Sequence, residues 1–448
     1  MTFKKTLTMI NLSAFVLSGA VSASEESLLD LYLVALNSDP QYQEAKFQHQ
    51  ANSEIVPQAR ADYLPTITFD YDRVKTTQNI ISSDNTVFER GSTSFPSTTM
   101  SISFTQPIFR YANYIRLGQA KAEFKKATVD LSLAQQDMML RLSEAYLASL
   151  AAEDEQGFLE VQKNSALEQL SIAQGRLNAG VGRPVDKFEA EARLASIEAD
   201  YSYAQIALSD SREALNEIIG RAPIGLARLT DSLILEKPNP EDELFWVDES
   251  LKHNPNIVVQ RHVVEVAKQE IKRQNGGHFP NLDLVLRSSR QETGGTLFGG
   301  GSEVGTNEVL LRLSVPLYSG GSVSSKKREA IALYAASKEK LEQLIRESRR
   351  QSKDAYWGVV NAVRRITALE KAVVAQEATL ELRRTAFESK LEAAIVVLDA
   401  ERDLYAARKD LFQAKYDYLL NQLRLRSLVG NLQQSDINIV NDWLVPKA

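Results

Sequence analysis

Residues 397–428 read VLDAERDLYAARKDLFQAKYDYLLNQLRLRSL, and this stretch decides the fold of the chain. Apolar residues recur at every seventh position, and the companion positions of the same heptad frame hold small or apolar residues, with Asn421 the polar exception. The two sets are Val397, Leu404, Leu411, Tyr418 and Leu425, and Ala400, Ala407, Ala414 and Leu428. Such a seam predicts a long helix that packs against other helices until Gly430 ends it.

The same seam occurs about 210 residues earlier, where Gly220 ends it. Other landmarks repeat with nearly the same spacing, since Pro316 follows Pro107 by 209 residues and Gly430 follows Gly220 by 210. The spacing varies only across loops expected between strands, where insertions are tolerated. We therefore predict an internally duplicated chain, with repeats at 24–221 and 243–430, a connector at 222–242 and a C-terminal tail at 431–448.

The 448 residues include no Cys and four His, and the formal net charge is −6. The lack of Cys excludes disulfides and thiol catalysis, and the negative charge gives no reason to expect nucleic-acid binding. Residues 1–23 predict a secretory signal, with Lys4 and Lys5 before an apolar run and a small-residue site at Val21-Ser22-Ala23. That run is short and interrupted by polar residues, so a membrane anchor is the weaker interpretation.

Four helical segments follow from the periodicity and from the turn residues between them. A helix over 111–178 would be about 100 Å long at ~1.5 Å per residue, which is far longer than an ordinary globular helix. Gly180, Gly182 and Pro184 then turn the chain into a return helix. The long helices are expected at about 111–178 and 321–390, and the return helices at about 184–219 and 395–429.

Each repeat also contains one predicted β-hairpin, at about 66–106 and about 281–315. Ile67, Phe69 and Tyr71 alternate with polar residues, which predicts a strand with one apolar face. We expect strands of about ten residues, a polar loop at 75–97, a Gly-rich loop at 294–305, and strand ends at Pro107 and Pro316. Strands of this length can cross a bilayer, although a half-buried soluble sheet has the same alternation.

No segment after the signal is apolar enough for a transmembrane helix, so membrane entry would use the strands. Four strands cannot close a barrel, because about eight is the smallest common number, so the barrel would be shared between subunits. The inward face would be polar, with Thr68, Asp70, Ser101, Ser103, Asp283, Arg287, Glu308 and Arg312. The predicted fold is a mixed α and β membrane protein, in which long antiparallel coiled-coil helices extend the lumen of the barrel.

Four segments carry a resemblance to a known family: VLDA at 397–400, AKYDYLL at 414–420, QPIF at 106–109, and VPLYSGG at 315–321. The chain resembles the TolC-type outer-membrane channels of Gram-negative bacteria. The resemblance implies a homotrimer with a 12-stranded β-barrel in outer-membrane lipid and an α-barrel tunnel in the periplasm. It also implies a periplasmic adaptor (membrane fusion protein), an inner-membrane pump of RND, ABC or MFS type, and passive export of drugs, toxins or secreted proteins without enzymatic activity or cofactors.

The resemblance assigns the two helix-hairpin ends to the periplasmic entrance, where they contact the adaptor. These residues are Asn178, Gly180, Val181 and Gly182 at the first end, and Ser389, Lys390 and Leu391 at the second. The second end departs from the family's Val-Gly-x-Arg-Thr run, because Lys390 stands for the usual Gly and Glu392 for the usual Arg. Pro107, Pro316, Gly320 and Gly321 mark the strand-to-helix joins.

The family's gate would pair an Arg of the second end with an acid of the first, but here Glu392 would repel Asp186. We therefore expect exchanged charges, with Arg183 facing Glu392. The alternative is two unrelated solvated charges, and even an exposed pair would contribute only about 0–1 kcal/mol. Of the two carboxylates per subunit that ring the entrance in known members, Asp399 remains and the other position is Val396. Asp399 would either set cation preference in the lumen or be a solvated surface acid.

Other chemistry has little support. The four His form no His-x-x-x-His pair with a carboxylate, which argues against a zinc site, and the loop at 294–305 has no Gly-Lys-Ser/Thr for phosphate. An export duct is therefore the predicted function, and a soluble periplasmic coiled-coil scaffold is the alternative. The loops between strands could serve secondarily as an adhesin or a phage receptor.

Overall fold

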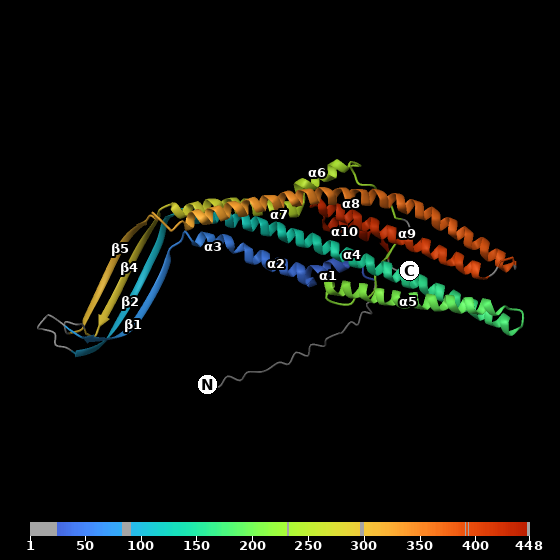
Figure 1. The fold of residues 1–448 in the computed structure, drawn as a ribbon, viewed down its shortest axis with the longest axis horizontal. Coiled ribbons are helices and arrows are strands. Elements are labelled where there is room, and N and C mark those ends of the chain that lie inside the picture. Colours follow the sequence, from blue (N-terminus) through green and yellow to red (C-terminus); the bar gives the residue numbers. More distant parts are fainter. Residues whose placement is uncertain are drawn as a thin grey trace, which may run out of the picture. The chain divides into compact units, whose positions relative to one another are not determined.

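The structure is a computed structural model that describes residues 25–82, 91–230, 233–295, 300–389, 391–392 and 394–445, so the predicted signal at 1–23 lies outside the described residues. The helices are α1 (Leu28–Ser38), α2 (Pro40–Ser53), α3 (Ile55–Ala61), α4 (Tyr111–Asn178), α5 (Pro184–Ile219), α6 (Glu243–His253), α7 (Pro255–Asn275), the 3-10 turn η1 (Gly276–His278), α8 (Ser322–Glu388), α9 (Ala394–Leu428) and α10 (Gln434–Asn441) (Figure 1). The strands are β1 (Thr66–Ile80), β2 (Gly91–Arg110), β3 (Arg228–Leu229), β4 (Asn281–Thr293), β5 (Ser302–Ser314) and β6 (Leu444–Val445).

The chain divides into two compact units. One unit comprises Leu36–Arg141 and Leu235–Asp436, and it contains the four-stranded sheet with α7, α8 and α9. The other comprises Met1–Ala35, Leu142–Ile234 and Ile437–Ala448, and it contains α5. The helix α4 is continuous through Tyr111–Asn178 and contributes to both units.

The heptad seam of α9 is buried along α8. Val397, Leu404, Tyr418 and Leu425 are each at most 5% exposed, and the two helices pack along each other. The polar exception, Asn421, lies against Gly358, where a Cβ would come within 3.1 Å of the Asn421 side chain. A glycine on α8 therefore makes room for the polar side chain in an otherwise apolar contact.

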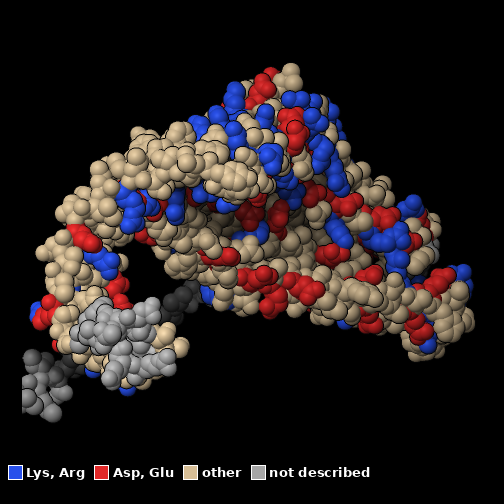
Figure 2. All heavy atoms as spheres, turned by 60° about the vertical axis from the view of Figure 1, so that its left-hand side comes forward, with Lys and Arg blue, Asp and Glu red and all other residues tan. Residues whose placement is uncertain are grey.

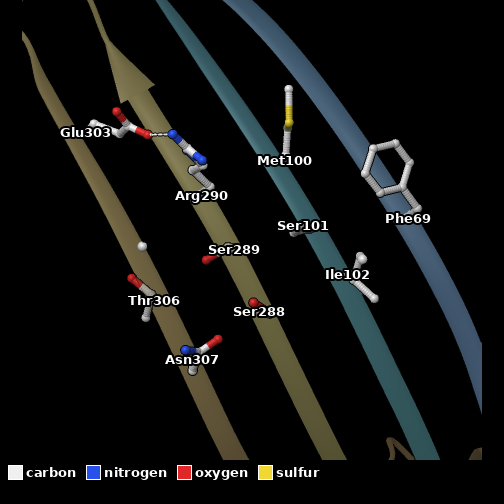
Figure 3. Close-up of a pocket in the computed structure, with 11 residues that line it drawn as sticks. Phe69, Met100, Ser101, Ile102, Ser288, Ser289, Arg290, Glu303, Thr306 and Asn307 are labelled. Carbon is white, nitrogen blue, oxygen red and sulfur yellow. Dashed lines mark ion pairs between the residues drawn. The ribbon is translucent and has the colours of Figure 1, made fainter.

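The main sheet has the strand order β1-β2-β4-β5, and all neighbouring pairs are antiparallel. Both predicted hairpins form, and β2 pairs with β4 to join them (Figure 3). Ile67 and Phe69 on β1 and Val309 and Leu311 on β5 are each at least 64% exposed, so one face of the sheet presents apolar side chains that this chain does not cover. Toward the loops, a depression of about 610 Å³ contains Phe69, Met100 and Ile102 together with the ion pair Arg290–Glu303 (Figure 3).

The predicted polar loop at 75–97 is wrong, because β1 continues to Ile80 and β2 begins at Gly91. Thr77 pairs with Ser94 in this extension. Thr and Ser occupy both faces here, so the apolar alternation disappears from the sequence although the backbone ladder continues. On the charge-coloured surface, Lys and Arg gather at the height of α6 and α8 in Figure 1 (Figure 2).

The expectation that Pro107 ends its strand is also wrong. β2 continues to Arg110, and the register with β4 shifts between Pro107 and Phe109. A bulge leaves one residue outside the regular ladder, so a residue without an N–H can lie within a paired strand. Arg110 beyond the bulge forms an ion pair with Asp283 at 2.9 Å.

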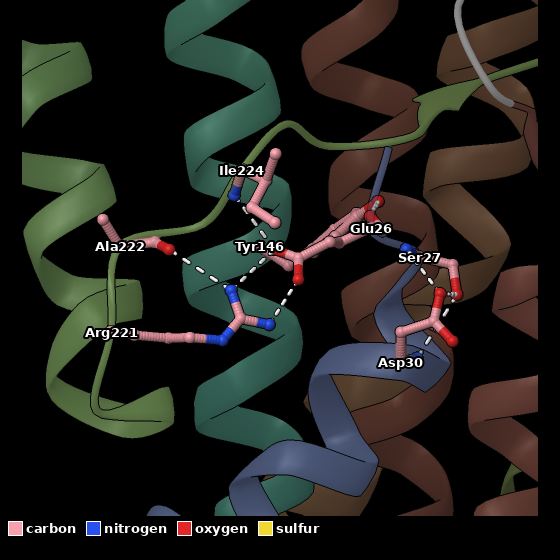
Figure 4. Close-up of polar contacts among 7 residues, drawn as sticks. All are labelled: Glu26, Ser27, Asp30, Tyr146, Arg221, Ala222 and Ile224. Atoms are coloured by element: carbon pink, nitrogen blue, oxygen red, sulfur yellow. Dashed lines mark hydrogen bonds and ion pairs between the residues drawn. The ribbon is translucent and has the colours of Figure 1, made fainter. Parts of the chain in front are cut away.

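The second unit is held together by contacts that the sequence analysis did not anticipate, which we call the clasp: Glu26, Arg221, Ile224, Tyr146 and Ala227. Figure 4 shows the first four of these residues. The Arg221 guanidinium forms an ion pair with the Glu26 carboxylate, which also accepts a hydrogen bond from the Ile224 backbone N–H at 3.0 Å. The buried Tyr146 hydroxyl donates to the Ala227 carbonyl at 2.8 Å. The N-terminal segment, α4 and the connector thereby meet.

The C-terminal tail adds to the same unit. β6 pairs antiparallel with β3 of the connector, and the Thr230 N–H donates to the Trp443 carbonyl at 2.8 Å. The Asn441 side chain accepts a hydrogen bond from the Leu29 N–H at 3.2 Å. The tail is thus a structural part of this unit rather than a simple extension of α9.

Acidification is expected to weaken the clasp. Burial raises the pKa of Glu26, but hydrogen bonds from Arg221 and the Ile224 N–H outweigh it, and the pKa lies below the usual 4.5. A carboxylate with a lowered pKa in the folded state contributes stability above about pH 4.5 and loses that contribution as the pH falls through the folded-state pKa. We expect Glu26→Gln to lower the free energy of unfolding by about 1–3 kcal/mol at pH 7. Thermal unfolding at pH 7 and pH 3.5 tests this, and an equal loss at both pH values would contradict it.

Candidate functional site at the two helix-hairpin ends

The turn between α4 and α5 is closed by its own backbone. Gly180 has a φ of 72°, a conformation that glycine adopts without strain. The N–H groups of Val181 and Gly182 both donate to the Arg176 carbonyl, at 3.0 and 2.9 Å. A Cβ on Gly182 would lie 2.7 Å from the Leu177 nitrogen, so this position also requires glycine. The first end is therefore a turn of defined shape.

The side chains of this turn combine exposed apolar groups with one local ion pair. Val181 is 79% exposed and Phe188, in the first turns of α5, is 63% exposed. Arg183 pairs with Asp186 at 2.6 Å, three residues along the same segment. A hydrogen bond from Arg183 holds the pKa of Asp186 below its usual value, so Asp186 stays ionised over the physiological range. The end presents an apolar tip beside a nearly neutralised charge pair.

The turn between α8 and α9 is different. The Ser389 N–H donates to the Thr385 carbonyl at 3.1 Å, and the Leu391 N–H donates to the Ala386 carbonyl at 2.9 Å. Leu391 is 80% exposed, as Val181 is at the first end. Lys390, which the sequence analysis assigned to the adaptor contact, lies outside the described residues.

Arg–carboxylate pairs connect the two helices of the second end. Arg384 on α8 pairs with the buried Glu401 on α9 at 2.7 Å, and Arg408 on α9 pairs with Glu377 on α8 at 2.6 Å. Arg383 on α8 pairs with Glu392 in the turn. The pairs flank an apolar cluster formed by Leu380, Val397, Ala400 and Leu404, with Val373 and Phe387 against it. Partners 17 or 31 residues apart follow no local spacing rule, so the sequence offered no signal for them.

Asp399, the predicted entrance acid, is half-exposed and lies 3.3 Å from Arg402. Arg402 also pairs with Asp403 at 2.7 Å, and this hydrogen bond raises the Arg402 pKa. One guanidinium therefore faces two carboxylates on the same surface of α9. The sequence analysis considered Asp399 alone and missed Arg402, although the spacing of three residues along a helix is a recognisable signal.

Of the predicted gate residues, Arg183 and Asp186 are brought together in the first turn, and Glu392 meets Arg383 in the second. The expected contact between Arg183 and Glu392 stays a prediction. At the second strand-to-helix join, Gly320 and Gly321 have φ values of 59° and 78°, and α8 begins directly after them. Among the described residues there is no group of three or more His, Asp or Glu that could hold a metal ion, and no helix there is long and apolar enough to cross a membrane.

Comparison with known proteins assigns the chain to a protein family. A profile of the family described as "Outer membrane efflux protein" matches residues 31–221 and 246–431, which together are most of the chain. The chain belongs to this family. The proteases secretion protein PrtF of Dickeya chrysanthemi is 29% identical over 434 residues, which are 95% of this chain and 93% of that relative. The outer membrane protein TolC of Vibrio cholerae is 29% identical over 439 residues, covering 96% and 95%.

The fold agrees with the family of outer membrane efflux proteins. The Campylobacter jejuni CmeC outer membrane channel matches with a TM-score of 0.78 at 13% identity, covering 93% of this chain and 88% of that one. The TolC-type resemblance is thus confirmed. As an outer membrane efflux protein, the chain is an exit duct in the outer membrane with a large periplasmic portion, which agrees with the predicted duct and not with the soluble scaffold.

Proposed function

We propose that three copies of this efflux protein complete one 12-stranded barrel across the outer membrane. The observation that carries the proposal is the open sheet, because β1 and β5 each have a partner strand on one side only among the described residues. Unpaired edge groups in lipid cost several kcal/mol each, and four strands are too few to close. The exposed apolar face of the sheet would contact lipid, and the opposite face, with Asp70, Arg287 and Glu308, would line a wet lumen.

The long helices would continue the lumen as a periplasmic tunnel of paired coiled coils. Two matches to the same family profile, at 31–221 and 246–431, support the internal duplication that would give each copy two helix hairpins. The exposed Val181, Phe188 and Leu391 would offer apolar contacts to a periplasmic adaptor, which would connect the duct to an inner-membrane pump. PrtF and TolC, the relatives named above, favour efflux or type I secretion as the pathway served.

Cysteine crosslinking tests the shared barrel, since the chain has no Cys of its own. Asp70→Cys on β1 is combined in turn with Glu308→Cys, Leu310→Cys or Arg312→Cys on β5, which lie on the same face. Within one chain β1 and β5 are three strand spacings apart, about 14 Å, which is too far for a disulfide. We expect one combination to give a covalent trimer on oxidation. Phe69→Cys, on the opposite face, is the control, and only monomers in every combination would contradict the proposal.

The charge of the entrance gives a second test. If Asp399 faces the lumen, Asp399→Ala should reduce cation selectivity and block by multivalent cations in planar bilayers. Arg402→Ala should increase both, because it leaves Asp399 and Asp403 without their shared guanidinium. The cation-to-anion permeability ratio should fall in Asp399→Ala and rise in Arg402→Ala, in each case by roughly a factor of two or more. Asp410→Ala on the same helix is the control, and unchanged conductance properties in both variants would place Asp399 outside the lumen.

A further inference from the structure

An apolar stripe on β5 runs without interruption into the second strand-to-helix join. Val309, Leu311 and Leu313 alternate on one face of the strand and are 80%, 64% and 64% exposed. Val315 and Leu317 continue the same alternation and are 48% and 93% exposed, and Tyr318 beside them is 87% exposed. Large apolar side chains at this exposure are favourable only if lipid or another chain covers them.

Three consecutive cations follow this stripe within a few residues. Lys326, Lys327 and Arg328 occupy the fifth to seventh positions of α8, which puts them about 6–10 Å along the helix axis at ~1.5 Å per residue. Lys326 and Arg328 are exposed and Lys327 is half-buried. Within the described part of the chain none of the three has an ion-pair partner, so their charge is available to an external anion.

The first join has no run of consecutive cations in the first two turns of α4. Arg110 there pairs with Asp283 at 2.9 Å, and Arg116 on α4 pairs with Asp62 at 3.2 Å. These two cations therefore neutralise carboxylates of this chain. A run of unpaired cations is therefore found in the first turns of α8 and not in those of α4.

We propose that Leu317, Tyr318 and the cations Lys326, Lys327 and Arg328 form a binding surface for phosphate-bearing lipid headgroups at the face of the membrane from which the helices project. The proposal rests on the membrane-spanning sheet proposed above. Leu317 and Tyr318 lie at the end of the apolar stripe and contact the acyl-chain boundary, where an aromatic ring with a polar tip is favoured. The cations, one to two helical turns further on, meet the phosphates, and a net negative headgroup such as phosphatidylglycerol is preferred over a zwitterionic one.

Lipid preference of the purified full-length protein tests the surface. Delipidated protein in detergent is titrated with phosphatidylglycerol and, separately, with phosphatidylcholine of the same acyl chains, and bound lipid is measured by native mass spectrometry. We expect wild-type protein to prefer phosphatidylglycerol. The triple variant Lys326→Gln, Lys327→Gln, Arg328→Gln should lose about 10- to 100-fold in phosphatidylglycerol affinity, at a factor of a few per cation, with little change for phosphatidylcholine.

A matched control removes the same charge elsewhere on α8. Lys338→Gln, Lys340→Gln, Arg349→Gln changes three exposed cations that begin about 25 Å along the helix from the join, beyond the headgroups. This variant should keep the wild-type preference. Leu317→Ser with Tyr318→Ser should weaken the binding of both lipids, because the apolar contact is common to them.

Conductance of the same samples separates the surface from the duct. Wild-type protein that conducts but shows no preference for phosphatidylglycerol overturns the lipid surface and leaves the duct intact. A control triple variant that loses the preference as fully as the test variant overturns it too, since bulk charge would then account for the effect. Protein that binds lipid but never conducts argues against the barrel instead.

Discussion

Leu311→Arg is expected to cost about 2–4 kcal/mol of stability in the bilayer per copy, because it places a guanidinium on what we propose is the lipid-facing side of β5. Leu311 is 64% exposed on the apolar face of β5 and pairs with Leu284 on β4. No neighbour on that face offers a carboxylate in the pairing register around it. The loss should be visible as a lower free energy of unfolding in lipid vesicles and as less protein in the outer-membrane fraction.

The adjacent residue supplies a matched control. Leu310 lies on the opposite face of the same strand, pairs with Val285, and has Glu308 and Arg312 two residues away on either side. Leu310→Arg introduces the same side chain into what we propose is a hydrated lumen, where a charge is tolerated. It should cost less than about 1 kcal/mol. Equal losses for the two variants would contradict the assignment of one face to lipid and the other to the lumen.

Gly430→Ala is expected to destabilise the protein by about 2–4 kcal/mol. Gly430 ends α9 with a φ of 67°, where any residue with a Cβ is strained by about 1–2 kcal/mol. A Cβ there would also lie 2.4 Å from the His253 carbonyl oxygen and 3.4 Å from Pro255 Cδ. His253 and Pro255 lie at the break between α6 and α7. Their backbone and ring atoms cannot move aside as the end of a flexible side chain could. Thermal or urea unfolding in detergent measures the loss.

Gly180→Ala is the control for the backbone part of this effect. Gly180 has a similar φ of 72°, but a Cβ there would meet no atom within 4 Å. The expected cost is therefore only about 1–2 kcal/mol. A Gly430→Ala variant no less stable than Gly180→Ala would show that α9 can shift away from His253.

The regular parts of the fold could be predicted because their signals are local and repeated. The heptads of α9 and the Gly and Pro residues after Asn178 place the helix ends within two residues of where the structure has them. The alternation from Ile67 to Tyr71 likewise predicts a strand. Where polar residues fill both faces, as from Thr76 to Asn79, the sequence pattern no longer reveals that the backbone is paired.

Contacts between distant residues could not be predicted. Glu26 and Arg221 are 195 positions apart, and β3 and β6 have two residues each, too few for any periodicity. At the hairpin ends the sequence identified the exposed turns but not the partners of their charges, because the pairs Arg384–Glu401 and Arg383–Glu392 depend on how α8 and α9 are aligned. Alignment of two helices is a tertiary property, which one segment alone does not encode.

The unit that contains the clasp is assembled from three separate parts of the chain, and the last of them is the tail. A polypeptide delivered from its amino end can form α5 and bury Tyr146 early, but β3 remains without its pairing strand until β6 has arrived. Completion of this unit therefore requires Leu444 and Val445, more than 200 residues further along the chain than β3. A chain that ended before Leu444 would leave the β3 edge unpaired, and an unpaired strand edge favours association with other chains.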